Sequence, residues 1–128
     1  MFNGNCAEAL ETYVKALGAK ITEMRKYGDM PPNPAFPIAE SDKGLVLHAR
    51  LSINGGELMC ADSSQRSGSG TNMYVSVTTP DTALVKTAWK ILKKDGEVYM
   101  ELEPSFFANL HGSLRDRFGI NWMFTASK

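Results

Sequence analysis

The sequence predicts an α+β fold built from two βαβββ modules in one domain. Two amphipathic helix patterns are each followed by three segments of strand character, so the same order of elements occurs twice. The residues repeat as well, because LHARLSINGGELM (47–59) aligns with LHGSLRDRFGINWM (110–123). The alignment pairs Leu47 with Leu110, His48 with His111, Leu51 with Leu114 and Gly56 with Gly119. We therefore place module one at about 1–62, a polar linker at 63–71 and module two at about 72–126 of the single domain 1–128.

The first module begins with a helix that starts at Asn5 and ends at Gly18. Gly18 supplies the left-handed residue that closes many helices. The spacing predicts a buried stripe made of Leu10, Tyr13, Val14 and Leu17. Strands are expected at Lys20–Tyr27, Leu45–Ile53 and Glu57–Ala61, with a Pro-rich loop at 28–44. Only Met1–Asn3 precedes the helix, so we expect the first strand to be short.

The second module repeats this order after a strand at Asn72–Thr78. Its helix is expected to start at Thr79-Pro80-Asp81, with Pro80 in the first helical position, and to end at Asp95-Gly96. The predicted buried face is Leu84, Ala88, Ile91 and Leu92. The strands that follow are expected at Glu97–Glu103, Leu110–Arg117 and Ile120–Thr125.

The composition narrows the class of protein. With 128 residues, 43% of them hydrophobic, the chain can bury a core without metals or disulfides. Fourteen basic residues balance fourteen acidic ones and no Lys/Arg block occurs, so we expect no nucleic-acid partner. No apolar stretch approaches the length of a membrane span and no signal peptide is evident, so we expect a cytoplasmic protein without a membrane partner. Cys6 and Cys60 lie far apart in the chain and are expected to be reduced thiols.

Four motifs in order carry a resemblance to a known family: FNGNCAEALETY (2–13), YGDMP (27–31), LHARLSINGGELMCAD (47–62) and GSLRDRFGINWMF (112–124). They resemble the PhnB-like branch of the vicinal oxygen chelate superfamily, which includes glyoxalases, bleomycin-resistance proteins and dioxygenases. The resemblance implies curved mixed sheets around a ligand cleft, helices on the outer face, and a homodimer. The branch is sometimes labelled a demethylubiquinone methyltransferase, but the sequence has no Gly-rich strand-to-helix turn that could hold S-adenosylmethionine.

If the resemblance holds, strand alternation predicts the side chains that line the cleft. On Leu45–Ile53, His48 and Arg50 share a face with Val46 and Ser52, opposite Leu47 and Ala49. On Glu97–Glu103, Tyr99 and Glu101 oppose Val98 and Met100. Trp122 and Phe124 are expected in the core. The expected ligand-binding residues are Arg50, Met59, Asn72, Tyr74, Tyr99, Phe107 and Met123.

The resemblance also gives the positions of the usual metal ligands. The resemblance places one ligand position at Met123, one nearest Met59, one near Asn72 and one at or before Met1. None of these residues is a usual ligand of Zn²⁺ or Fe²⁺, so we expect no metal and no other cofactor. A divalent metal is the alternative, held by His48 and His111 with Glu101. The competing interpretation is that both histidines are hydrogen-bonded within a sheet or at a dimer contact.

The sequence thus predicts a protein that binds a small, partly apolar molecule in its cleft. The alternative is an enzyme, either a metal-dependent glyoxalase or dioxygenase relative or a metal-free lyase or isomerase. The candidate catalytic residues are His48, Glu101 and His111. A purely structural module would have closed packing in place of a cleft.

Overall fold

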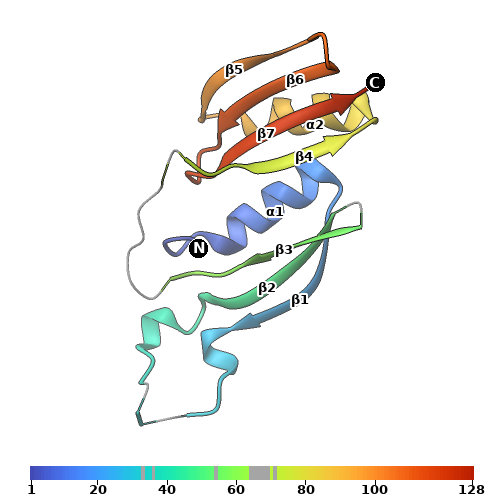
Figure 1. The fold of residues 1–128 in the computed structure, drawn as a ribbon. Helices are drawn as coiled ribbons and strands as arrows, with labels where there is room; N and C mark the ends of the chain where they lie inside the picture. The colour runs from blue at the N-terminus through green and yellow to red at the C-terminus, as the bar shows by residue number, and fades with distance from the viewer. Residues whose placement is uncertain (33, 36, 54, 64–69, 71) are drawn as a thin grey trace. The chain divides into compact units, whose positions relative to one another are not determined.

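The computed structural model describes residues 1–32, 34–35, 37–53, 55–63, 70 and 72–128. By its internal contacts the chain divides into two compact units, residues 1–14 with 19–67 and residues 15–18 with 68–128. The described residues form two α-helices and two curved, open sheets (Figure 1). The α+β class and the βαβββ modules are therefore confirmed. Most of the expected linker, residues 64–69 and 71, lies outside the described part of the chain.

Module one contains one α-helix and a three-stranded antiparallel sheet. The helix α1 (Cys6–Leu17) is followed by β1 (Lys20–Lys26), β2 (Val46–Ile53) and β3 (Gly56–Cys60), in the sheet order β1-β2-β3. Two short 3-10 helices, η1 (Tyr27–Asp29) and η2 (Glu40–Asp42), lie in the loop between β1 and β2. The short first strand is confirmed, because Phe2 forms only an isolated parallel bridge with Asp62.

The helix α1 supplies much of the core of module one. It buries Leu10 and Tyr13 as predicted, while Val14 is only half-buried. Leu17 is also buried as predicted, but it belongs to the second compact unit. Gly18, just beyond the helix, has φ +62°, which is the conformation expected of a residue that closes a helix. The same core includes the fully buried Cys6, Ala9, Val46, Ala49 and Leu51.

A buried carboxylate fixes the start of α1. Asp62 is 1% exposed, and one of its oxygens accepts hydrogen bonds from Gly4 N (3.0 Å) and Cys6 N (2.9 Å). Its other oxygen accepts from Val46 N (2.9 Å). Asp62 thus satisfies amides at the first turn of α1 and at the first residue of β2, which are 40 or more positions apart in the chain. Because these donors are distant in sequence, local capping patterns do not predict this arrangement.

One bulge changes the predicted facing of β2. Arg25 pairs with His48 but Lys26 pairs with Val46, so Leu47 is an extra residue in β2. The predicted alternation is therefore wrong at the start of this strand: Val46 is fully buried, whereas Leu47 is half-buried. From His48 onward the alternation holds, because Ala49 and Leu51 are buried and Arg50 lies on the other face.

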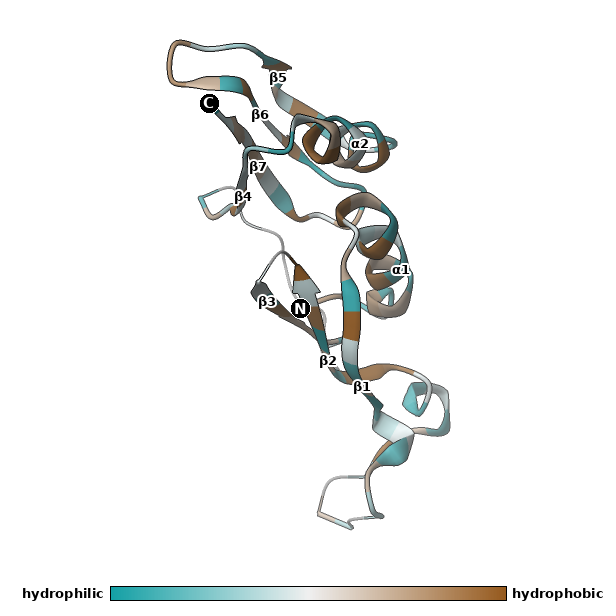
Figure 2. Cartoon of the chain, turned by 90° about the vertical axis from the view of Figure 1, so that its right-hand side faces the viewer, coloured by the Kyte–Doolittle hydropathy of each residue, from teal (hydrophilic) through white to brown (hydrophobic). Residues whose placement is uncertain are grey.

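Module two is a complete βαβββ unit. Its elements are β4 (Val75–Thr79), α2 (Thr82–Leu92), β5 (Glu97–Glu103), β6 (Ala108–Arg115) and β7 (Asn121–Ser127), in the sheet order β4-β7-β6-β5. β4 runs parallel to β7 and the other pairs are antiparallel, so the sheet is mixed. Figure 2 shows α2 along one side of this sheet, with hydrophobic segments on the helix and on β6. Trp122 and Phe124 are fully buried, as predicted.

The helix α2 begins at Thr82, two residues after the predicted first helical residue Pro80. Asp81 is its N-cap and accepts a hydrogen bond from Leu84 N (3.1 Å), so Pro80 precedes the helix and is not its first residue. The buried residues are Val85, Ala88, Trp89 and Leu92, while Leu84 and Ile91 are half-buried. Trp89 meets Phe124 of β7 edge-on, with ring centroids 6.3 Å apart. The buried face therefore includes Val85 and Trp89, which the predicted stripe lacks.

The strand register confirms the internal repeat. Arg50 is opposite Met59 in module one, and Ser113 is opposite Met123 in module two. His48 and His111 each lie two residues before the first member of these pairs. The two histidines and the two methionines therefore occupy equivalent positions in the two sheets.

Candidate functional site

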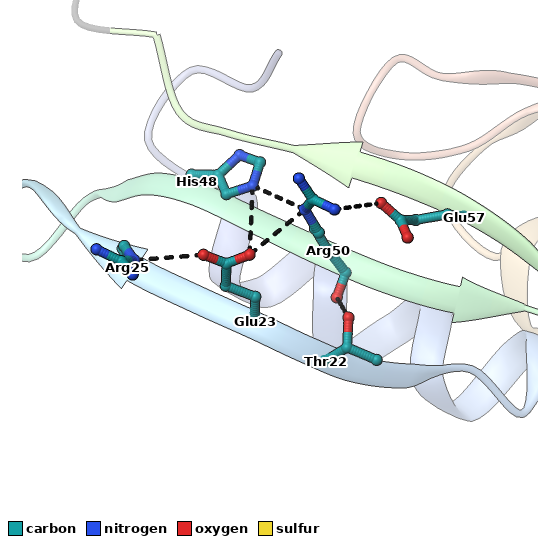
Figure 3. A network of polar contacts seen from close by, with 6 residues as sticks. All are labelled: Thr22, Glu23, Arg25, His48, Arg50 and Glu57. Atoms are coloured by element: carbon teal, nitrogen blue, oxygen red, sulfur yellow. Dashed lines mark hydrogen bonds and ion pairs between the residues drawn. The ribbon is translucent and has the colours of Figure 1, made fainter.

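In module one, charged side chains gather on the open face of the sheet. We call the group the Arg50 cluster; it contains Thr22, Glu23, Arg25, His48, Arg50 and Glu57 (Figure 3). Glu23 lies at its centre, 3.3 Å from Arg25 Nε, 3.4 Å from Arg50 Nε and 3.9 Å from His48 Nε2. A second carboxylate, that of Glu57, lies 3.0 Å from Arg50 Nη1. Arg50 is therefore held between two carboxylates.

His48 lies beside Arg50 in the same cluster. Arg50 Nε donates to His48 Nε2 at 3.3 Å. An arginine side chain has only donors, so Nε2 is the acceptor in this contact. The same nitrogen lies 3.9 Å from Glu23 Oε2, so the imidazole lies between a guanidinium and a carboxylate.

Bulges bring these charged groups together. Ile21 pairs with Leu51 and Glu23 pairs with Arg50, so Thr22 is an extra residue in β1. Glu23 and Arg25 then alternate onto the face that carries Arg50 and His48. Thr22 Oγ1 also donates to the Arg50 carbonyl at 3.4 Å. Strict alternation along Lys20–Tyr27 would place Glu23 on the same face as Ile21, so the sequence pattern alone does not indicate that Glu23 joins this cluster.

In module two the equivalent face is more aromatic and richer in methionine. We call it the His111 face; it contains Tyr74, Tyr99, Met100, Phe107, His111, Asn121, Met123 and Thr125. Ser113 pairs with Met100 on one side and with Met123 on the other, so these two thioethers share one row across the sheet. The next row contains Glu103, His111 and Thr125. Met100 is 55% exposed, while Met123 is half-buried.

His111 is positioned by two neighbours. Its Nδ1 lies 3.0 Å from Thr125 Oγ1, and its ring meets the Phe107 ring at a centroid distance of 4.9 Å. His111 itself is half-buried and Phe107 is 50% exposed. The imidazole therefore has one fixed polar contact and one aromatic wall, and the side chain keeps an exposed part.

At the other end of this face, Asn121 is a buried hydrogen-bond centre. Its Oδ1 accepts from the Tyr99 hydroxyl at 3.0 Å, and its Nδ2 donates to Gly70 O (2.7 Å) and Met73 O (3.1 Å). Tyr99 in turn meets Tyr74 edge-on at 6.1 Å. Asn121 thus holds two tyrosine rings on the open face, a role that no sequence pattern indicated.

The remaining predicted site residues are placed as follows. Met59 is 63% exposed on the Arg50 side of module one, and Asn72 is exposed just before β4. Glu101 is exposed on β5 and makes no hydrogen bond or ion pair with a described residue. The residue of β5 directly opposite His111 is Glu103.

The donor groups in the described residues do not match the metal sites implied by the fold. Within the described ranges, no three His, Cys, Asp or Glu side chains come together as a metal site. The positions of the usual ligands hold the thioethers of Met59 and Met123 and the amide of Asn72, which are weak donors for Zn²⁺ or Fe²⁺. Burial raises the pKa of Cys6 from 9.0 to about 12 and also raises that of Cys60, so both thiols stay protonated near neutral pH.

Comparison with known proteins identifies the family. The family profile described as 3-demethylubiquinone-9 3-methyltransferase matches residues 1–125. The chain belongs to this PhnB-like family. Protein YjdN of Escherichia coli K12 is 26% identical over an alignment of 136 positions, which covers 99% of this chain and 91% of YjdN.

Solved structures agree with the PhnB-like assignment. Protein PA1353 from Pseudomonas aeruginosa is 32% identical with a TM-score of 0.83, covering 97% of this chain and 90% of PA1353. The PhnB protein from Bacillus cereus is 28% identical with a TM-score of 0.77, and the match covers 98% of this chain and 93% of the Bacillus cereus protein. FosX from Listeria monocytogenes, solved with Mn(II) and a dihydroxypropylphosphonic acid, is 8% identical with a TM-score of 0.65 over 100% of this chain and 88% of FosX. The FosX likeness shows the shared fold alone.

No helix in the described residues is long and apolar enough to cross a membrane.

Proposed function

We propose that this PhnB-like protein binds a small, partly apolar molecule on the His111 face without using a metal. The observation that carries the proposal is the combination of exposed thioether and aromatic side chains with a half-buried imidazole on one sheet face. Exposed apolar side chains beside a few fixed polar groups are typical of ligand sites. Met100 and Met123 offer an adaptable apolar wall, and Phe107 offers a ring for a planar group. His111 and Thr125 offer hydrogen bonds to a polar group.

Two observations support binding without the usual metal or a methyl donor. The metal-ligand positions implied by the family hold Met59, Met123 and Asn72, so a divalent ion has few hard donors. The strand-to-helix connection of module two reads Thr79-Pro80-Asp81 and lacks the glycines of a nucleotide-type turn. The methyl-transfer activity in the family's description is therefore not part of the proposal.

The test uses the methionine methyl groups as reporters. A fragment screen by NMR on protein labelled at the methionine methyls should find planar, partly apolar fragments that shift Met100 and Met123 in a saturable way. Met123→Ala should weaken the binding of the best fragment by about tenfold or more, because it removes part of the apolar wall of the site. Met24→Ala is the matched control, since Met24 pairs with the buried Ala49 in module one. A screen that leaves the Met100 and Met123 methyls unshifted would contradict the proposal.

A metal-free lyase or isomerase is the second candidate, and one observation favours it. His48 lies on the open face of module one, with Nε2 3.9 Å from Glu23 Oε2, and a histidine beside a carboxylate is a common general-base arrangement. Under the binding proposal, His48→Ala changes affinity at most. Loss of a measured turnover in His48→Ala, with fragment binding at the His111 face intact, would favour the enzyme.

The proposal includes a homodimer, as the family resemblance implies. Phe106, in the connection between β5 and β6, is 91% exposed, and such a ring is more stable against a protein partner than in water. Light scattering coupled to size-exclusion chromatography should give twice the mass of the chain. A monomeric mass across the micromolar range would contradict this part of the proposal.

A further inference from the structure

The loop between β1 and β2 contains a pocket of its own. The pocket has a volume of about 380 Å³, within the size range of small-molecule sites. Its lining residues all belong to module one, between the end of β1 and the start of β2. Figure 1 shows this loop extending beyond the strands. Its lining residues are Tyr27, Met30, Ala35, Pro37, Ile38, Ala39, Asp42 and Leu45. None of them belongs to the Arg50 cluster or to the His111 face, so the pocket is independent of the proposed function.

The lining combines apolar walls with a single charged side chain. Asp42 is half-buried, and its carboxylate makes no hydrogen bond or ion pair with a described residue. The neighbouring Glu40, in contrast, is exposed and paired with Lys43 at 2.8 Å. The pocket thus has one negative charge that is not neutralised by the described part of the chain.

Tyr27 lines this pocket, and its hydroxyl is bonded elsewhere. The hydroxyl donates to the Asp62 carbonyl at 3.1 Å, so its hydrogen is already used. An aromatic face beside a carboxylate attracts an organic cation, through the ring quadrupole and through charge. The aliphatic walls add burial for an apolar group on the same ligand.

Backbone hydrogen bonds hold the base of the pocket. Tyr27 N donates to Leu45 O and Gly28 N donates to Lys43 O, both at 2.9 Å, so the two ends of the loop are tied together. Leu45 N donates to Asp42 O at 3.0 Å, which fixes the turn that carries the carboxylate. The lining residue Pro37 further limits the conformations of the loop. A fixed base lowers the conformational cost of binding a ligand in the pocket.

From this lining we propose that the pocket binds a small organic ammonium ion that carries an apolar group. Asp42 is the counter-ion for the ammonium group, and the Tyr27 ring lies against the cation. Met30, Ile38 and Pro37 enclose the apolar part. The site requires no metal and no residue of module two.

The experiment uses phenethylammonium chloride and, as its neutral analogue of similar size, 2-phenylethanol. Each is titrated into the full chain labelled at the methionine and alanine methyls. Phenethylammonium should shift the Met30 and Ala39 methyls in a saturable way and bind about tenfold more tightly than 2-phenylethanol. Asp42→Asn should remove this difference in affinity, because it should weaken the binding of phenethylammonium and leave the binding of 2-phenylethanol unchanged.

Glu40→Gln is the matched control, because it removes a neighbouring charge that does not line the pocket. It should leave the affinity for phenethylammonium within about twofold of the unmodified chain, as expected for an exposed charge. Ala39→Leu fills the pocket and should abolish binding of both probes, so the proposal can be tested even if Asp42→Asn fails to fold. The proposal is overturned if the pocket methyls do not shift, if 2-phenylethanol binds as tightly as the cation, or if Glu40→Gln weakens binding as much as Asp42→Asn.

Discussion

At the scale of single residues, buried carboxylates organise both modules. Asp62 joins the start of α1 to the start of β2. Asp116 is 4% exposed and accepts from Phe118 N (2.9 Å), Ile120 N (3.0 Å) and Trp122 Nε1 (2.8 Å), so it shapes the turn between β6 and β7. Charge-assisted hydrogen bonds of this kind are stronger than neutral ones. Each of these two residues therefore has a structural role.

Asp62→Asn should destabilise the protein by about 2–4 kcal/mol, because an amide offers only one acceptor oxygen to three backbone N–H groups and brings its own NH₂ toward them. Urea unfolding measures this loss. Asp81→Asn is the matched control, since Asn caps a helix about as well as Asp and should change stability by less than about 0.5 kcal/mol. Equal losses in the two variants would contradict the role assigned to Asp62.

Cys6 predicts a dependence of stability on alkaline pH. Its folded pKa is raised from 9.0 to about 12 by burial. In the unfolded chain the thiol loses its proton near pH 9, while the folded protein keeps the proton, so the unfolded state is favoured as pH rises from 9 to 12. The contribution of Cys6 is fully present below pH 9. Chemical unfolding at pH 8 and pH 10.5 should show a smaller pH-dependent loss of stability in Cys6→Ala than in the unmodified chain.

At the scale of elements, strand pairing depends on close approach at particular glycines. A Cβ added to the buried Gly112 of β6 would lie 2.9 Å from Leu102 Cα and 3.0 Å from Met100 O of β5. Both neighbours are backbone atoms and cannot move independently of the strand. The irregular register between β5 and β6 in this region is consistent with such an approach. Gly112 therefore lets β5 pair closely with the strand that carries His111.

Gly112→Ala should destabilise the protein by about 1–3 kcal/mol, the usual cost of overpacking. It should also disturb the backbone amide signals of β5, because that strand must move. Gly44→Ala is the control: its added Cβ meets nothing within 4 Å, and Gly44 does not have a positive φ. Thermal unfolding and amide spectra of the two variants make the comparison, and a fully stable Gly112→Ala would exclude the close approach.

At the scale of the whole molecule, the two modules share the same strand arrangement but carry different side chains on their open sheet faces. His48 and His111 occupy equivalent positions, as the repeat in the sequence predicted. His48 lies among charged groups in the Arg50 cluster, whereas His111 lies between a threonine and a phenylalanine. Duplication has therefore kept the backbone while the surrounding side chains have diverged. Because the exposed methionine and aromatic side chains lie on the His111 face, we expect the apolar ligand to bind to module two.

For the whole chain, we expect stability to be independent of divalent metals. Adding EDTA, or one equivalent of Zn²⁺ or Mn²⁺, should leave the melting temperature unchanged within about 1 °C, because an ion raises it only by binding the folded state. Differential scanning calorimetry makes the measurement. A dose-dependent rise with one metal, lost in His48→Ala or His111→Ala, would overturn the metal-free proposal.

Local patterns in the sequence determined the elements, their order, the internal repeat and the family, because helix and strand periods and turn residues act over a few positions. The stripe of Leu10, Tyr13 and Leu17 and the burial of Trp122 and Phe124 are examples. Only the tertiary structure decided the facing of Val46 and Leu47, the start of α2 after Pro80, and the contacts of Glu23, Asp62 and Asn121. The physical reason is that bulges and long-range hydrogen bonds depend on the partner strand, which one segment of sequence does not specify.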